Sequence, residues 1–186
     1  MAEVTVEPAT FTMVEFDAGT IAAVVERVAD DVGLPADLGV RLEVDEKTPL
    51  MRSRVESIDP VTLSAESGAF EDLKHPRHLS EVRTADVVGR LLFRVADRLD
   101  ESFGDPGDDA DLSLPRLVAW DCYAVARMAR LGYKAQRQRR LYHFRNRHGF
   151  TDVGDAAFDT IWTSESLTWD DLVRLSDESL AAAPAA

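Results

Sequence analysis

The sequence SEVRTADVVGRLLFRVADRL, at Ser80–Leu99, decides the fold because the hydrophobic pattern of the chain changes its period there. From this point apolar residues recur every three or four positions, as they do on one face of a helix. The apolar face is wide, so we expect a central, largely buried helix, with Asp86 four residues before Arg90 as support on its surface. The apolar positions are Val82, Ala85, Val87, Val88, Leu91, Leu92, Phe93, Val95, Ala96 and Leu99.

The chain before Ser80 shows strand patterns and one helix pattern. Asp59–Pro60 separates two of the strand patterns and favours a hairpin turn between them. Between the first two strands, apolar residues at helical spacing predict a helix that begins near Asp17 or Thr20 and ends at Gly33. The predicted strands are Thr10–Phe16, Val40–Asp45, Arg52–Ile58 and Val61–Ser67.

The chain after Leu99 is predicted to be helical apart from its connections. Asp100–Asp111 contains six acidic residues and no basic one, and its glycines and proline favour a loop. Thr168 and Asp171 have the spacing of a helix cap and predict the start of the last helix. The predicted helices are Ser113–Leu131, Ala135–His148, Asp152–Trp162 and Trp169–Ala182.

Strands followed by helices predict an α+β fold. We expect a small, mostly antiparallel sheet with one N-terminal helix, followed by four or five packed helices. The sequence has no internal repeat and no long linker, so we expect a single α+β domain. That domain would span residues 1–182, with a sheet-forming part at 10–67, a helical part at 80–182 and a frayed tail at 183–186.

The composition narrows the setting in which the protein works. The 186 residues include 34 acidic and 21 basic side chains, and the net charge of −13 argues against general binding of nucleic acid. Cys122 is the single cysteine, so no internal disulfide forms. The start of the sequence lacks the features of a signal peptide, and no apolar run reaches the roughly 20 residues that cross a bilayer. A cytoplasmic protein without membrane contact is therefore expected.

One segment departs from the acidic balance. Lys134–His148 holds six basic residues, two histidines and no acid, and without those six charges the net charge would be −19 instead of −13. At helical spacing the segment has one face with Phe144 and His148 and another that carries most of the charge. The candidate binding residues on the charged face are Arg139, Arg140, His143 and Arg147.

Three interpretations of this basic segment remain open. Its arginines pair with acids of the same chain or of a second copy in a homo-oligomer, most obviously those of Asp100–Asp111. Alternatively, the segment docks against an acidic protein partner. In the third interpretation it binds a small anionic ligand, a nucleotide or RNA, because arginine offers paired donors for phosphate and the interleaved aromatic residues offer stacking surfaces.

Histidines and acids elsewhere give weaker candidates. His75 and His78 form an H-x-x-H pair in a loop, where zinc would need further ligands, and surface histidines are the commoner outcome. Asp121 falls on an apparently buried row of its helix, which favours a structural ion pair with an arginine over acid–base chemistry. The loop at Asp100–Asp111 lacks the spacing of a calcium-binding EF-hand, and Cys122 has no neighbouring base.

The predicted order is a helix, the strand Val40–Asp45, a second strand, the strand Val61–Ser67 and the long helix Ser80–Leu99. This order resembles the minimal zincin-like metallopeptidase topology, in which the long helix carries H-E-x-x-H. The corresponding stretch here, Thr84–Phe93, is TADVVGRLLF and has neither histidine nor glutamate. The resemblance covers about half of the chain and carries over no site residue. It implies a fold relative without the metal chemistry.

The sequence favours a non-enzymatic binding protein over an enzyme. It contains no G-x-G-x-x-G, no G-x-x-x-x-G-K-[ST], no G-x-S-x-G and no H-E-x-x-H. We therefore expect a cytoplasmic protein, without a cofactor or a bound metal, that uses the basic segment to contact an acidic partner or a small anionic ligand. The alternatives are an enzyme with an unrecognised site, metal-dependent or not, and an RNA-binding protein.

Overall fold

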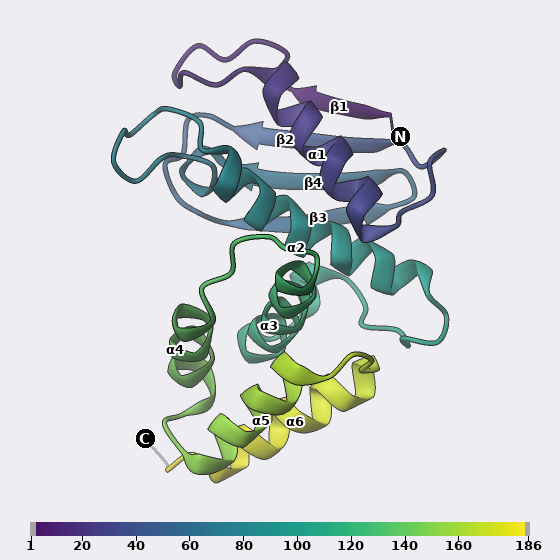
Figure 1. Ribbon diagram of the computed structural model, residues 1–186, viewed down its shortest axis with the longest axis vertical. Coiled ribbons are helices and arrows are strands. Elements are labelled where there is room, and N and C mark those ends of the chain that lie inside the picture. Colours follow the sequence, from purple (N-terminus) through teal and green to yellow (C-terminus); the bar gives the residue numbers. More distant parts are fainter. Residues whose placement is uncertain (1–2, 185–186) are drawn as a thin grey trace. The chain divides into compact units, whose positions relative to one another are not determined.

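The computed structural model describes residues 3–184 and has an α+β fold, as predicted. The chain divides into two compact units, Met1–Ala96 and Asp97–Ala186. The first contains four strands and the second most of the helices (Figure 1). The elements are β1 (Val4–Glu7), α1 (Ala18–Val32), β2 (Val40–Asp45), β3 (Ser53–Ile58), β4 (Val61–Glu66), α2 (Glu81–Leu99), α3 (Leu114–Arg130), α4 (Arg137–His148), α5 (Asp152–Thr163) and α6 (Trp169–Ala182).

The sheet of the first unit has the strand order β1-β2-β4-β3. The pairs β1–β2 and β2–β4 are parallel, and only β3–β4 is antiparallel. The sheet is therefore mostly parallel, and the prediction of a mostly antiparallel sheet is wrong on this point. Helix α1 returns the chain to the side where β1 began, which makes β1 and β2 parallel. The predicted hairpin at Asp59–Pro60 is confirmed, but β3 lies outside β4, so β4 pairs with β2 in the parallel sense.

The first strand is Val4–Glu7, whereas the sequence predicts Thr10–Phe16. In the latter segment the carboxylate of Glu46 accepts hydrogen bonds from the backbone N–H groups of Thr12 and Met13, both at 2.7 Å. A side chain satisfies these donors where a strand partner would otherwise do so. The alternation of apolar residues in this segment therefore does not form a strand.

One face of the sheet is covered and the other is open. In β2 the side chains of Val40, Leu42 and Val44 are buried, and Arg41 and Glu43 between them are exposed. Helices α1 and α2 lie on the same side of the sheet (Figure 1). Helix α1 begins as predicted, with the Asp17 carboxylate accepting from the Thr20 N–H, and ends at Gly33, whose φ of 84° favours glycine.

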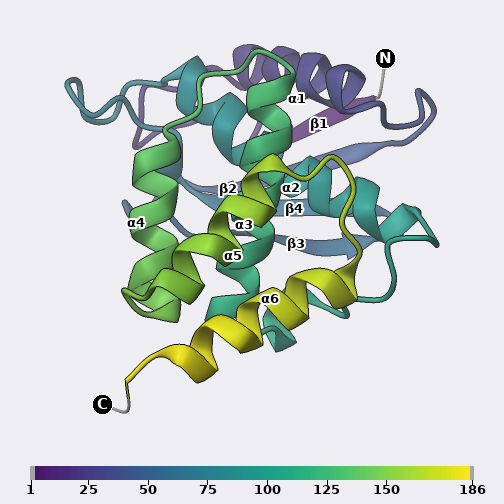
Figure 2. The same cartoon turned by 60° about the horizontal axis from the view of Figure 1, so that its bottom comes forward.

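The second unit is built from α3, which contacts α4, α5 and α6. Helices α5 and α6 pack along each other (Figure 2). Helix α6 begins with the predicted cap, in which the Thr168 side chain and the Asp171 side chain each bond the other residue's backbone N–H. The predicted tail at 183–186 includes residues 185–186, which lie outside the described residues.

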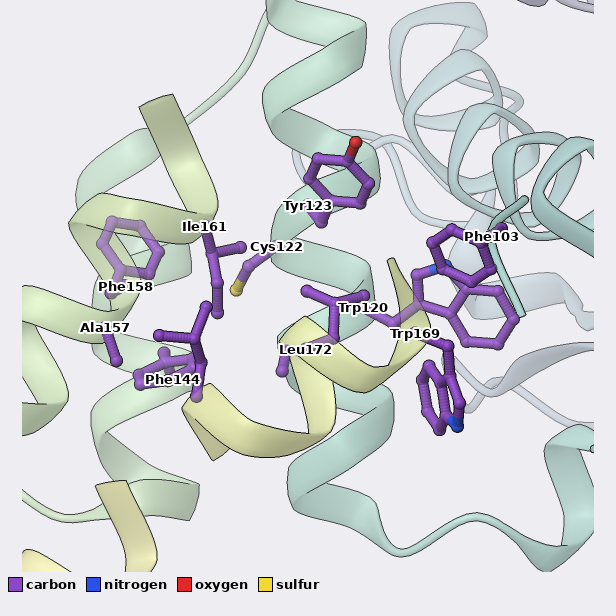
Figure 3. Close-up of a cluster of buried hydrophobic side chains, with 12 residues drawn as sticks. Phe103, Trp120, Cys122, Tyr123, Phe144, Ala157, Phe158, Ile161, Trp169 and Leu172 are labelled. Carbon is purple, nitrogen blue, oxygen red and sulfur yellow. The ribbon is translucent and has the colours of Figure 1, made fainter. Parts of the chain in front are cut away.

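The core of the second unit is rich in aromatic residues. Trp120 is fully buried, stacks on Phe103 with ring centroids 5.6 Å apart and contacts Trp169 at 5.2 Å. Phe144 of α4 and Phe158 of α5 complete the opposite end of this cluster (Figure 3). Trp162 is partly buried and packs against the same cluster. Within residues 3–184, no helix has the length and apolar character needed to cross a membrane.

Candidate functional site

Helix α4 fixes the basic segment against the core of the second unit. Phe144 and His148 are fully buried, and Arg137 and Leu141 on the same face are half-buried. The His148 ring stacks on Phe144 with centroids 3.8 Å apart. His143 lies on the exposed face. The predicted division of this helix into a face with Phe144 and His148 and a face with most of the charge is present, and the first of these faces is buried.

Two arginines of α4 pair with acids of α5. Arg145 donates Nε–H and Nη2–H to the two carboxylate oxygens of Asp155 at 2.8 and 2.6 Å, and this contact lowers the pKa of Asp155. Arg137 pairs with Asp159 and lies over the ring of Phe158. The expected internal pairing therefore occurs for at least two of the six basic residues of the segment, Arg137 and Arg145.

The acidic loop is used differently from the sequence expectation, which pairs it with the basic segment. Its buried member, Asp109, accepts a hydrogen bond at 2.7 Å from Arg98, at the end of α2. Arg98 also donates to the carbonyl of Gly107 and lies over the ring of Trp120. The loop is thus held to the end of α2 and to the aromatic core, while Arg137 and Arg145 of α4 pair with acids of α5.

The exposed face of α4 carries a cationic row, which we define as Arg139, His143 and Arg147. These residues follow one another at intervals of four and are all exposed. Within the part of the chain that the structure describes, neither Arg139 nor Arg147 has an ion-pair partner. The fourth candidate, Arg140, is half-buried at the flank, where its carbonyl oxygen lies 3.8 Å from the Cys122 sulfur. The structure therefore brings three of the four candidates into one exposed row.

Two exposed aromatic rings lie beside the cationic row, and we call them the aromatic pair. Tyr142 and Phe150 are 57% and 63% exposed, and their rings meet edge to face with centroids 6.1 Å apart. Arg145 lies over Phe150 at 5.9 Å. The sequence indicates that aromatic residues interleave with the basic ones, but it does not show that these two meet at the surface.

His148 and Ser176 form a buried polar contact. His148 Nδ1 lies 3.1 Å from the Phe144 carbonyl oxygen and Nε2 lies 2.9 Å from Ser176 Oγ. A carbonyl only accepts, so the neutral ring carries its proton on Nδ1 and Nε2 accepts from the serine. This is the geometry of an activated hydroxyl, but both side chains are fully buried. Substrate has no access to the hydroxyl in this arrangement, and the contact joins α4 to α6.

Burial lowers the pKa of His148, although the hydrogen bond to Phe144 and the charge of Asp177 act in the opposite direction. The unfolded chain therefore binds this proton more readily than the folded chain does. We expect neutral His148 to make its full contribution to the free energy of unfolding above the ordinary pKa of 6.5. Below that pH the free energy of unfolding should fall, by at most about 1.4 kcal/mol per pH unit.

This pH dependence is measured by denaturant unfolding of the wild type and the His148→Asn variant, between about pH 7.5 and about pH 5.5. The variant is expected to be less stable at the higher pH and to lose less stability on acidification. Equal losses in the two proteins would contradict the assignment of this slope to His148.

The second unit buries Asp97 and Asp109, but not Asp121. Asp121 is only half-buried, because the start of its predicted row is at the surface, where Leu114 is 48% exposed. Asp97 is 5% exposed and accepts hydrogen bonds at 2.6 Å from each terminal nitrogen of Arg127 and at 2.6 Å from Trp120 Nε1. Sequence reasoning missed this contact, because Asp97 is close to the end of α2, where acids are usually exposed.

The loop histidines each have an acidic neighbour. His75 Nδ1 lies 3.6 Å from Asp72, and His78 Nδ1 lies 3.3 Å from Glu15. The two imidazole rings have their centroids 6.3 Å apart. Among residues 3–184, no three histidine, cysteine or acidic side chains are grouped so that they could hold one metal ion.

Comparisons with protein-family models, curated proteins and solved structures find no significant match to this chain. The resemblance to the zincin-like topology therefore stays a prediction. The fold and the surface therefore describe this protein as an α+β protein in which one helix, α4, has an exposed cationic face.

Proposed function

We propose that this protein binds an acidic surface of a partner protein through the cationic row of α4. The observation that supports the proposal is the division of the arginines of this helix. Arg137 and Arg145 are paired with α5, whereas Arg139 and Arg147 are exposed without an ion-pair partner among residues 3–184. The internal pairs hold the helix, and the charges of Arg139 and Arg147 are available to another molecule.

The spacing of the row favours a protein surface over a small anion. Arg139 and Arg147 are eight residues apart on one helix, which corresponds to about 12 Å along its axis. One inorganic phosphate could contact both arginines only if their long side chains converged over this distance, which costs side-chain entropy. Carboxylates of a helix or an extended segment can be spaced to match them.

Charge reversal on the row is expected to weaken binding of an acidic peptide. The probe is a fluorescent peptide of glutamate and serine, about ten residues long, at about 0.1 M salt, where distant acids of the chain are screened over about 10 Å. Arg139→Glu with Arg147→Glu is expected to lower its affinity at least about tenfold, because two attractions become repulsions. Fluorescence anisotropy measures the change.

The matched control reverses two arginines on other helices, Arg116→Glu with Arg174→Glu. It has the same net charge, and both arginines belong to exposed ion pairs that contribute little to stability. It is expected to bind the peptide like the wild type. Equal weakening in both double variants would assign the effect to net charge and would reject the cationic row as the binding site.

A further inference from the structure

The aromatic pair adds an apolar surface to the cationic row, and this combination specifies the partner more closely. We infer that the acidic segment bound by α4 also carries an apolar or aromatic side chain that packs on Tyr142 and Phe150. The inference rests on the proposed function, because it concerns the same surface. It assigns the site to an amphipathic acidic segment of another protein, not to a uniformly charged one.

The first support is the exposure of the two rings. Tyr142 is 57% exposed and Phe150 is 63% exposed, and they make an edge-to-face contact with centroids 6.1 Å apart. Paired rings at a surface offer a large, rigid apolar area that binding can cover at little cost in conformational entropy. Large aromatic residues and arginine are also the residue types that contribute most to protein interfaces.

The second support is the position of the pair relative to the charges. On α4, Tyr142 lies within the length of the cationic row and directly precedes His143. Arg145 lies over the ring of Phe150 and is held there by Asp155, so this ring has a fixed charged neighbour. A partner whose carboxylates reach Arg139 and Arg147 and which also covers the neighbouring flank of α4 would therefore contact the aromatic pair.

The number of charges favours a peptide over RNA. Nucleic-acid binding at moderate salt depends on several phosphate contacts at once, whereas the row offers two arginines without an ion-pair partner within residues 3–184. The net charge of −13 also repels a strand that carries one phosphate per nucleotide. It opposes a second copy of this chain as well, since both copies carry that charge.

The test uses two peptides of equal charge and length, about ten residues each, measured against the full chain by fluorescence anisotropy. One contains only glutamate and serine, and in the other two of the serines are replaced by phenylalanine. We expect the second peptide to bind about three- to tenfold more tightly to the wild type. Phe150→Ser and Tyr142→Ser should each reduce this gain, which is measured as the ratio of the two peptide affinities within the same variant.

Leu114→Ser is the matched control, because Leu114 is similarly exposed, at 48%, on a different helix. It should retain the full gain. Equal affinities of the wild type for the two peptides would overturn the inference and leave the proposed function standing. Failure of both peptides to bind would reject the proposed function itself.

Two further measurements test the other occupants. A single-stranded RNA of about the same length that binds more tightly than either peptide, and is weakened by Phe150→Ser, would overturn the inference in favour of base stacking. Self-association of the wild type that Phe150→Ser abolishes in sedimentation would overturn it in favour of a second copy. Monomeric behaviour and weak RNA binding are the results expected.

Discussion

Replacement of Asp97 by alanine is expected to lower the free energy of unfolding of the second unit by about 3–5 kcal/mol. The carboxylate accepts three hydrogen bonds of 2.6 Å, two from the guanidinium of Arg127 and one from the indole of Trp120. Its removal leaves a cation in a mostly buried place and takes the partner from an indole N–H whose residue is fully buried. Most of the destabilisation comes from leaving the Arg127 guanidinium and the Trp120 N–H without the Asp97 carboxylate as acceptor. The attraction within the ion pair itself contributes less.

Denaturant unfolding followed by tryptophan fluorescence measures this loss, since all three tryptophans are in the second unit. Asp177→Ala is the control. Asp177 pairs with Arg116 at 3.0 Å, but both side chains are exposed, so about 1 kcal/mol or less is expected. Similar losses of stability in the two variants would contradict the prediction that the burial of Asp97 makes its contacts more stabilising than those of an exposed ion pair.

Local features of the fold were predictable because short-range sequence determines them. The cap of α6 needs only Thr168 and Asp171, three residues apart, and the end of α1 needs only the glycine at position 33. The strand order depends on which strands meet after the chain has turned back. The sequence shows the β3–β4 hairpin, whereas the pairing of β2 with β4 brings together residues such as Leu42 and Leu63. No local signal specifies that pairing.

In the candidate site, too, the features that depend on short-range sequence were predictable and those that depend on tertiary packing were not. The helical period separates the buried face of α4, with Phe144 and His148, from the exposed face, with Arg139 and Arg147. The partners of Arg137 and Arg145 could not be predicted, because they depend on how α5 packs. One of the three interpretations of the sequence pairs them with the acidic loop, whereas the structure pairs them with Asp159 and Asp155.

The contacts of α4 with α5 and α6 matter for the proposed binding, because they fix the helix before any partner arrives. His148 joins α4 to Ser176 of α6, and Arg145 joins it to Asp155 of α5. A cationic row on a fixed helix loses only side-chain freedom on binding, which reduces the entropic cost. Disruption of these contacts is therefore expected to weaken peptide binding without removing any charge from the exposed row.

Gly68→Ala is expected to destabilise the first unit by about 3 kcal/mol or more, which is the upper range for overpacking. A Cβ atom at this position would lie 2.1 Å from the Pro49 carbonyl oxygen and 2.5 Å from that of Leu50. Both obstacles are backbone atoms, so no side-chain rotation relieves them. Arg83 donates to the Gly68 carbonyl at 3.0 Å and further restricts any shift of the segment.

Gly39→Ala is the matched control in the same unit, because a Cβ there meets nothing within 4 Å. It is expected to be neutral, or to stabilise by up to about 1 kcal/mol through the entropy of the unfolded chain. The first unit has no tryptophan, so far-UV circular dichroism follows its unfolding. If Gly68→Ala unfolds at the same denaturant concentration as Gly39→Ala, the loop at residues 47–52 must be able to move away from residue 68. The close backbone approach would then not be a fixed part of the fold.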